Sequence, residues 1–428
     1  MSQQRISLGS YWRLVRGNAN FRRLWTAQIV SEIGDWFYMV TLYAMLLEFT
    51  GKAESVAMAF VLQVLPQALV GPFAGVINDR ISRRKVMIAT DLVRAVIVAC
   101  VLFVRTPAMV WLVYPLLFLE TTMWGLFEPA RTAVIPNVVE KDETLVANTL
   151  ASSTWSVNLF LGAALGGAAA VWLGRDAVFA LDAASFLFSA FMISRMKFAE
   201  PHTEARGPAR LRDFFDHSDV VEGFRYVREN RLFTPLVVKG VLGVTGASWV
   251  IFPVLGKEVF PLHRAGISAE QGVLLGISML MGARGLGTLL GPLAVAPWAE
   301  QRTNRLRIGI VLGFVLYGLG YVALGHIATA PVAYAAVIFS HMGGALVWVF
   351  STTLLQLITD DRFRGRVFAA ELAFCTVMLA VSAQAAGYAI DHGVDVRMVS
   401  FVTGIVTLVA GAVWAAFGAR EKPLPASS

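Results

Sequence analysis

The stretch "GPFAGVINDRISRRKVMIATDLVR", residues 71–94, places a dense group of charges between two apolar segments. Seven consecutive positions hold five charged residues: Asp79, Arg80, Arg83, Arg84 and Lys85. By contrast, residues 398–418 contain no Asp, Glu, Lys or Arg. Because about 20 apolar residues suffice to cross the hydrocarbon core as a helix, the stretch is predicted to be a short polar turn between two membrane-crossing helices.

The composition of the whole chain supports the same interpretation. Of its 428 residues, 57% are hydrophobic and 15% are charged, whereas a soluble protein carries about a quarter of its residues charged. The net charge of +7 does not indicate nucleic acid, because basic residues of membrane proteins collect on cytoplasmic loops. The two cysteines, Cys100 and Cys375, lie in apolar segments and define no disulfide framework or metal site.

Apolar runs bounded by charge, Gly and Pro predict an all-α integral membrane protein with twelve transmembrane helices. The predicted spans are 24–48, 53–78, 86–105, 108–128, 145–172, 175–196, 232–260, 270–297, 305–327, 331–357, 366–390 and 397–418. Most Lys and Arg residues fall on segments that share the side of the two termini, which places both termini in the cytoplasm. The N-terminal segment lacks the apolar core of a cleaved signal peptide. We therefore expect a multi-pass protein of the cell (inner or plasma) membrane.

The chain is predicted to divide into two pseudo-symmetric six-helix halves, 1–196 and 232–428, joined by a cytoplasmic linker, 197–231. "LVGPFAGVINDRISRRKVMI" from Leu69 recurs weakly as "LLGPLAVAPWAEQRTNRLRI" from Leu289. Such repeats are typical of one of the major transporter architectures. In the linker, apolar residues at helical spacing predict an amphipathic helix on the inner membrane surface.

The spacing Gly75-x-x-x-Asp79-Arg80-x-x-Arg83-Arg84, with "DLVR" following, resembles the signature loop of the major facilitator superfamily. Span count, central linker and internal repeat extend the resemblance over the whole chain, although Ser82 stands where the family usually has Gly. The resemblance implies a conformational latch on the cytoplasmic face. The latch residues are Gly75, Asp79, Arg80, Arg83, Arg84, Asp91, Arg94 and Glu128.

In such a latch, Asp79 is expected to cap the N-terminus of a facing helix, where the helix dipole favours an anion. The arginines of the loop are expected to reach carboxylates such as Asp91 or Glu128, and Glu128 is expected to pair with Arg131. Ordinary positive-inside topology explains the arginines equally well, but it does not explain Asp79.

The segment "NLFLGAALGG", residues 158–167, resembles the glycine pattern of antiporters in this superfamily. Gly162, Gly166 and Gly167 match that pattern, while Asn158 replaces its first Gly and Ala163 its Pro. The alternative is ordinary small-residue packing between membrane helices.

Charges inside the membrane are costly and are therefore candidates for function. Gln28, Glu32 and Asp35 share one face of the first predicted span, and Glu120 with Trp124 lies in the fourth. By the resemblance, these helices line the central cavity. A carboxyl group there can take up a proton on one side and release it on the other. The alternative for Asp35 is a structural hydrogen bond.

The second half supplies basic residues instead. Arg284 lies in the middle of the eighth span and lacks a sequence neighbour of opposite charge, so we expect a carboxylate across the cavity. Lys239 in the seventh span either faces the cavity or snorkels to the inner surface. His341 is interpreted as a satisfied core residue, and Asp182 as a solvated residue near the outer end of its helix.

The sequence shows no catalytic residues, no metal ligands and no cofactor motif. "GLGTLLG", residues 285–291, lies inside a predicted membrane helix with no preceding strand. A phosphate-binding loop of the ATPase kind is also missing, so the protein is predicted not to be an enzyme.

The segments "FRRLWTAQIVSEIGDWFYMVTLYAMLL", "FEPARTAVIP" and "RGRVFA" resemble the drug and macrolide efflux branch of the superfamily. This implies a secondary transporter that exports an amphipathic, largely apolar small molecule by proton antiport. The expected partners are that molecule, protons and the bilayer, with no nucleic acid, and the protein is expected to be monomeric. Alternatives are a lysophospholipid, lipid or siderophore transporter of the same fold and, more remotely, a non-transporting membrane sensor. Sodium coupling also stays open.

Overall fold

The computed structural model describes residues 8–140, 143–200, 225, 228, 233–299, 302–359 and 361–418. Every regular element within these ranges is a helix. In chain order the elements before the linker are α1 (Leu8–Gly17), α2 (Ala19–Thr50), α3 (Ala53–Arg80), α4 (Arg83–Val101), η1 (Pro107–Leu112), α5 (Val113–Val138), α6 (Thr144–Leu173) and α7 (Arg175–Ser194). After it come α10 (Phe233–Leu242), η3 (Gly243–Ala247), α11 (Ser248–Glu258), α12 (Ala269–Ala299), α13 (Thr303–Leu324), α14 (Ala330–Ile358), α15 (Asp361–Asp391) and α16 (Val396–Gly418).

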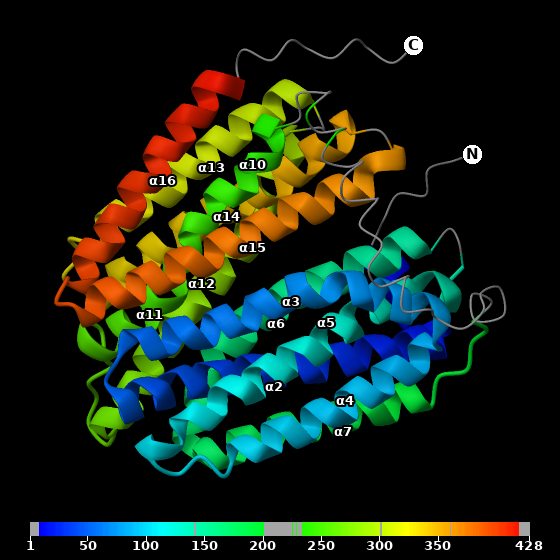
Figure 1. Ribbon diagram of the computed structural model, residues 1–428, viewed down its shortest axis with the longest axis horizontal. Helices are drawn as coiled ribbons and strands as arrows, with labels where there is room; N and C mark the ends of the chain where they lie inside the picture. The colour runs from blue at the N-terminus through cyan, green and yellow to red at the C-terminus, as the bar shows by residue number, and fades with distance from the viewer. Residues whose placement is uncertain are drawn as a thin grey trace. The chain divides into compact units, whose positions relative to one another are not determined.

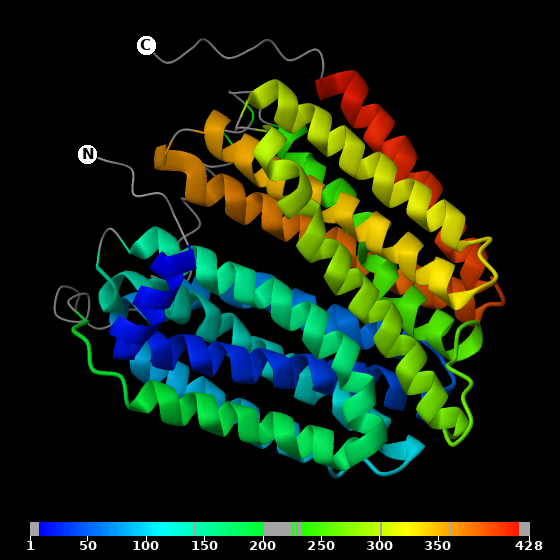
Figure 2. The ribbon, with the colours of Figure 1, turned by 180° about the vertical axis from the view of Figure 1, so that it is seen from behind.

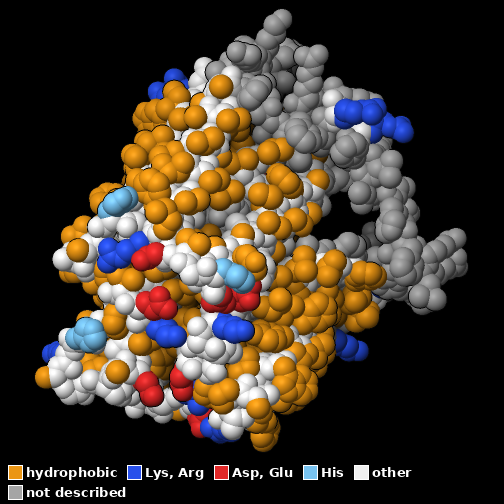
Figure 3. Space-filling view, turned by 60° about the vertical axis from the view of Figure 1, so that its left-hand side comes forward, with side chains coloured by type: hydrophobic (Ala, Val, Ile, Leu, Met, Phe, Trp, Pro, Cys, Tyr) orange, Lys and Arg blue, Asp and Glu red, His pale blue; other side chains and the backbone are white. Residues whose placement is uncertain are grey.

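Ten segments within the described part of the chain are long and apolar enough to cross a membrane. The helices α2 and α4 are not among them, because both carry several charged residues along their length. Large apolar side chains are exposed on the outside of the helices; Trp172, for example, is 82% exposed. Hydrophobic side chains cover most of the face in Figure 3. An apolar exterior of this kind is typical of contact with lipid.

The chain forms two compact units, and each is described by itself. The first unit contains Met1–Leu42 and Leu69–Phe215. In it, α4 packs against both α5 and α7, and α4 and α7 lie side by side in Figure 1. One core cluster of this unit is built from buried apolar residues of α1, α2, α4, α5, α6 and α7, such as Leu14, Phe21 and Met87.

The second unit contains Tyr43–Ala68 and Asp216–Ser428. Here α13 packs against α14 and α16, and α12 against α14; the neighbouring α13 and α16 can be followed in Figure 2. Residues 43–68, the end of α2 and the start of α3, belong to this unit although they precede the linker in sequence.

The seventh predicted span, 232–260, is not one continuous α-helix. It consists of α10, the 3₁₀ segment η3 and α11. The glycines of η3 lie directly against α15, because a Cβ atom added at Gly246 would lie 2.2 Å from the Leu379 carbonyl oxygen. The Ser382 hydroxyl also donates to the Gly243 carbonyl oxygen at 2.8 Å. A 3₁₀ interruption of this kind often marks a hinge.

Two further segments, one at the start of the chain and one in the linker, bear on the sequence predictions. Sequence patterns did not predict the short helix α1, which places Leu14 in the core of the first unit. The amphipathic helix predicted in the linker falls almost entirely outside the described residues.

Candidate functional site

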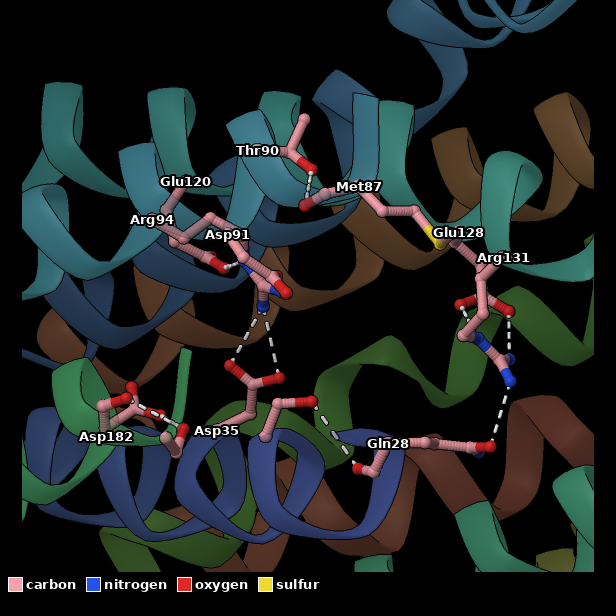
Figure 4. A network of polar contacts seen from close by, with 12 residues as sticks. Gln28, Asp35, Met87, Thr90, Asp91, Arg94, Glu120, Glu128, Arg131 and Asp182 are labelled. Atoms are coloured by element: carbon pink, nitrogen blue, oxygen red, sulfur yellow. Dashed lines mark hydrogen bonds and ion pairs between the residues drawn. The ribbon is translucent and has the colours of Figure 1, made fainter. Parts of the chain in front are cut away.

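The centre of the candidate site is Arg94 on α4, whose side chain is 2% exposed. Its guanidinium donates from Nη2 to both carboxylate oxygens of Asp35 on α2, at 3.0 and 3.1 Å. It also donates from Nε to Glu120 on α5 at 2.9 Å. Asp91, one turn earlier on α4, lies 3.8 Å from Nη1, and the Phe186 ring of α7 lies 3.8 Å from the guanidinium carbon. Four helices therefore converge on one cation, as Figure 4 shows.

The charges around Arg94 do not balance. Three carboxyl groups lie within ion-pair distance of a single guanidinium. In a medium of low dielectric constant, uncompensated charge is costly. Asp35 is the most accessible of the three acids, with a side chain 32% exposed, whereas Asp91 is completely buried. The cluster therefore holds more acid groups than basic ones, and Asp35 is its most accessible acid.

A further acid, Asp182 on α7, lies near this cluster (Figure 4). We expected it to be solvated, and that expectation was wrong, because its side chain is completely buried. A Cβ atom added at Gly34, next to Asp35 on α2, would lie 2.5 Å from the Asp182 Oδ1 atom. The close approach of α2 and α7 at this glycine removes Asp182 from solvent.

Glu32, one turn before Asp35 on α2, belongs to a second polar group. One of its oxygens accepts from Gln28 Nε2 at 2.8 Å, and the other accepts from Asn158 Nδ2 at 2.8 Å. The Gln28 Oε1 atom in turn accepts from Arg131 Nη1 at 2.9 Å. The sequence thus correctly placed Gln28, Glu32 and Asp35 on one face of α2, but the two acids have different partners.

Arg131 connects this group to the C-terminal half of α5. Its Nε atom donates to Glu128 Oε2 at 2.8 Å, so the expected pairing of Glu128 with Arg131 is confirmed. Trp124 lies on the same helix between Glu120 and Glu128 and is partly exposed. The hydrogen bonds among Glu32, Gln28 and Arg131 therefore join α2 to the C-terminal half of α5.

The predicted latch loop is short, since α3 ends at Arg80 and α4 begins at Arg83. The side chains of Gly75 and Asp79 lie outside the described residues, so the capping role of Asp79 stays a prediction. The Ser82 hydroxyl caps α4 by accepting from the Lys85 backbone N–H at 3.3 Å. This cap gives a physical reason for Ser where the family usually has Gly.

The arginines of the loop bond backbone carbonyl groups. Arg83 donates to the carbonyl oxygen of Ala133 at 3.0 Å. Arg84 donates to the carbonyl oxygens of Ile193 and Ser194 at the end of α7. Asp91, which we expected these arginines to reach, pairs instead with Arg94 on its own helix. Asp91 and Arg94 therefore belong to the Arg94 cluster and not to the loop, because they lie one turn apart on α4 and contact each other.

The matching glycines of α6 are points of close helix contact. A Cβ atom added at Gly162 would lie 2.6 Å from Trp36 Cβ, and one at Gly166 would lie 3.2 Å from Phe37 Cα. Both positions, like Gly167, are buried. This geometry, with α2 lying against α6, fits ordinary small-residue packing between membrane helices, which was the alternative to the antiporter interpretation of these glycines.

In the second unit, Lys239 on α10 does not snorkel to the inner surface. Its Nζ donates to Glu371 Oε2 on α15 at 2.9 Å, and the two side chains are 6% and 1% exposed. The Trp348 ring of α14 lies 4.5 Å from the ammonium group. Sequence reasoning missed Glu371, although an acid inside the predicted span 366–390 was itself the available signal.

Arg284 on α12 has a different environment. Its guanidinium carbon lies 3.6 Å from the Trp249 ring of α11, and Nη1 donates to Ser248 Oγ at 3.2 Å. Among the residues that the structure describes, no carboxylate lies within ion-pair distance of Arg284. The expected carboxylate partner is thus not found within the second unit. His341 on α14 is buried against Tyr317, Tyr321 and Phe252, and its Nε2 atom lies 3.2 Å from the Tyr321 hydroxyl.

The sequence matches the family described as "Transmembrane secretion effector" over residues 12–422. Macrolide efflux protein A of Streptococcus pyogenes is 26% identical over 288 residues, which are 64% of this chain and 67% of that protein. The uncharacterized MFS-type transporter YfmI of Bacillus subtilis (strain 168) is 23% identical over 389 residues, covering 90% of this chain and 93% of that protein.

Solved structures show the same fold. The nucleoside transporter NupG aligns with a TM-score of 0.71 and 10% identity over 94% of this chain and 99% of that chain. The peptide transporter POT in complex with sulfate aligns with a TM-score of 0.70 and 13% identity over 94% of this chain and 95% of that chain.

The family match and the MFS-type relatives thus identify a multi-pass membrane transporter. The chain belongs to the transmembrane secretion effector family within the major facilitator superfamily, and it resembles the efflux branch.

Proposed function

We propose that this transporter exports an amphipathic, largely apolar small molecule in exchange for protons. The observation that carries the proposal is the Arg94 cluster, in which three acids from three helices surround one buried cation. A cluster with surplus acid groups can exist in two protonation states. Because Asp35 pairs with Arg94 only when it is ionised, protonation of Asp35 frees Arg94 for Glu120 and Asp91. Binding of a proton to Asp35 therefore changes the contacts between α2 and α4.

The proposed topology supports this mechanism. We infer that α2 and α4 also cross the membrane, which gives twelve spans in two six-helix halves, 1–196 and 232–428. Their charged residues then lie at membrane depth, where charges are retained for function. Both termini are inferred to be cytoplasmic in the cell (inner or plasma) membrane, with a monomer as the working unit. The macrolide efflux relative supports a drug-like cargo and the direction of transport.

The experiment uses purified protein in liposomes with an imposed pH gradient and a fluorescent amphipathic dye. An acidic lumen is expected to drive accumulation in the wild type. Asp35→Asn and Glu120→Gln are each expected to abolish the response to the gradient. Downhill movement of the dye without a gradient should remain.

The matched control is Asp176→Asn, which alters an exposed acid at the start of α7 paired with Arg105. This variant is expected to behave as the wild type. If both cluster variants keep gradient-driven accumulation, the coupling role of the cluster is wrong. If a sodium gradient drives accumulation and a pH gradient does not, the coupling ion has to be reassigned.

A further inference from the structure

Arg284 lies at the midpoint of α12, fifteen residues from either end of Ala269–Ala299. Other largely buried basic side chains in the helices have an acid partner: Arg94 pairs with Asp35, Arg131 with Glu128, and Lys239 with Glu371. Within the described part of the second unit, Arg284 has none. A charge at this depth is costly and is normally kept for a functional reason.

The contacts of Arg284 leave its donors largely free. A guanidinium carries five N–H donors in a planar fork. One plane of this fork lies against the Trp249 ring, and Nη1 uses a donor on Ser248 Oγ. No other acceptor among the described residues bonds the guanidinium. The edge of the fork is therefore available for a bidentate contact, which is the geometry that carboxylate and phosphate groups match.

The residues around this edge are aromatic and rigidly packed. Trp249 stacks on Phe60 with ring centroids 4.9 Å apart. One turn after Arg284, an added Cβ at Gly287 would lie 3.0 Å from His341 Cβ, which places His341 and the aromatic group of α11, α13 and α14 near the arginine. That group comprises Phe252, Tyr317, Tyr321 and His341. Such a surface favours a flat or apolar body through stacking and dispersion.

We propose that Arg284 binds an anionic group, a carboxylate or a phosphate, on the transported molecule. The apolar body of the same molecule lies against the aromatic residues named above, with Trp249 holding the guanidinium plane in place. This proposal rests on the proposed export function and narrows its substrates to amphipathic anions. It also gives Arg284 the partner that the described residues do not supply.

The test measures equilibrium binding to detergent-purified full-length protein, so that it does not depend on transport. Two matched probe pairs share their apolar body and differ in charge. The first pair is 1-pyrenebutyrate and the neutral 1-pyrenebutanol. The second is lysophosphatidic acid and the neutral monoacylglycerol of the same chain length. Ligand-induced thermal stabilisation reports binding of each probe.

The wild type is expected to bind one or both anions at least about tenfold more tightly than the neutral counterpart. Preference in the first pair alone points to a small-molecule carboxylate, and preference in the second alone to a phosphate lipid. Arg284→Gln is expected to lose the preference while it keeps binding of the neutral probes. Arg284→Lys is expected to keep part of it, because charge is retained and the fork is lost. Arg105→Gln removes an exposed charge as the control.

Equal binding of charged and neutral probes by the wild type would overturn the proposal. So would an anion preference that persists in Arg284→Gln. Because that variant replaces a membrane-embedded residue, Trp249→Phe serves as a second variant that is expected to weaken the preference and leave the arginine in place. An anion preference in a protein that fails to transport any probe would reject the export function and leave the binding site intact.

Discussion

Asn158 on α6 donates a hydrogen bond to Glu32 on α2, with 2.8 Å between Nδ2 and Oε2. The second oxygen of Glu32 accepts from Gln28 on its own helix, so both oxygens of this acid are held. Asn158 is one of the two positions, with Ala163, at which the chain departs from the glycine pattern of antiporters. This departure supplies the donor that holds the Glu32 carboxylate.

Asn158→Ala is expected to destabilise the protein and weaken transport, because it leaves one oxygen of Glu32 without its donor. Loss of a hydrogen bond to a buried or partly buried charged group costs about 1–3 kcal/mol in the free energy of unfolding. Thermal unfolding of the purified protein measures the effect. Ser153→Ala on an exposed position of the same helix is the control. Equal melting temperatures for both variants would show that the Glu32 contact carries no stability.

The Arg94–Asp35 contact is expected to show strong energetic coupling in a double-mutant cycle. Arg94→Met alone leaves three acids around a missing cation, and breaking a buried pair of this kind costs about 3–5 kcal/mol. Asp35→Asn in the same chain removes one of these acids, so the double variant is expected to be more stable than the sum of the single effects predicts. Thermal unfolding in detergent gives the four values of the cycle.

The matched control is a cycle on Arg105 and Asp176, whose side chains are 53% and 54% exposed. Exposed ion pairs contribute little, so coupling in that cycle is expected to be close to zero. Equal coupling in the two cycles would mean that the Arg94 cluster behaves as an ordinary surface pair.

Much of this architecture could be predicted from apolar runs and charge placement. Each predicted span overlaps a described helix or run of helices, because a membrane-crossing segment is identified by its own composition. Four of them, 86–105, 175–196, 232–260 and 305–327, extend past the helix ends. The break of the seventh span at η3 could not be predicted, since it depends on the contact of Gly243 and Gly246 with α15. That contact joins segments more than 130 residues apart in sequence.

Several residues of the candidate site could be predicted from the sequence, but the ion pairs that they form could not. Asp35 and Glu120 were recognised because each is a charge inside an apolar segment. Arg94 was assigned to the loop, since in sequence it follows the loop motif closely. Its position on α4 turns it toward α2 and α5 instead. Glu371 carries the same signal, a charge inside a predicted span, and was missed all the same. Its pairing with Lys239, 132 residues away, could not be predicted from the sequence.

Lys239 and Glu371 are expected to tolerate joint replacement and to resist single replacement. Glu371→Met alone leaves a buried ammonium group without its carboxylate and should lower the yield of folded protein. The pair Lys239→Met with Glu371→Met removes both charges, which is often neutral or stabilising. Size-exclusion profiles and melting temperatures measure the outcome. A double variant as unstable as the single one would indicate that the packing around Trp348 requires the charged groups themselves.

Asp391, the last residue of α15, is expected to stabilise the start of α3. Its carboxylate oxygens accept from the backbone N–H groups of Ala53 and Glu54, at 2.7 and 2.9 Å. These are the first two residues of α3, whose N–H groups have no partner within the helix, and the helix dipole favours an anion there. Asp391→Ala is expected to lower the free energy of unfolding by about 0.5–2 kcal/mol and to speed amide hydrogen exchange at the start of α3. Asp391→Asn is expected to have an intermediate effect.

The control is Asp176→Ala, which removes an exposed acid from the first turn of α7 and should leave amide hydrogen exchange in α3 unchanged. If Asp391→Ala leaves amide hydrogen exchange in α3 unchanged, water satisfies the first N–H groups of α3 as effectively as the Asp391 carboxylate does.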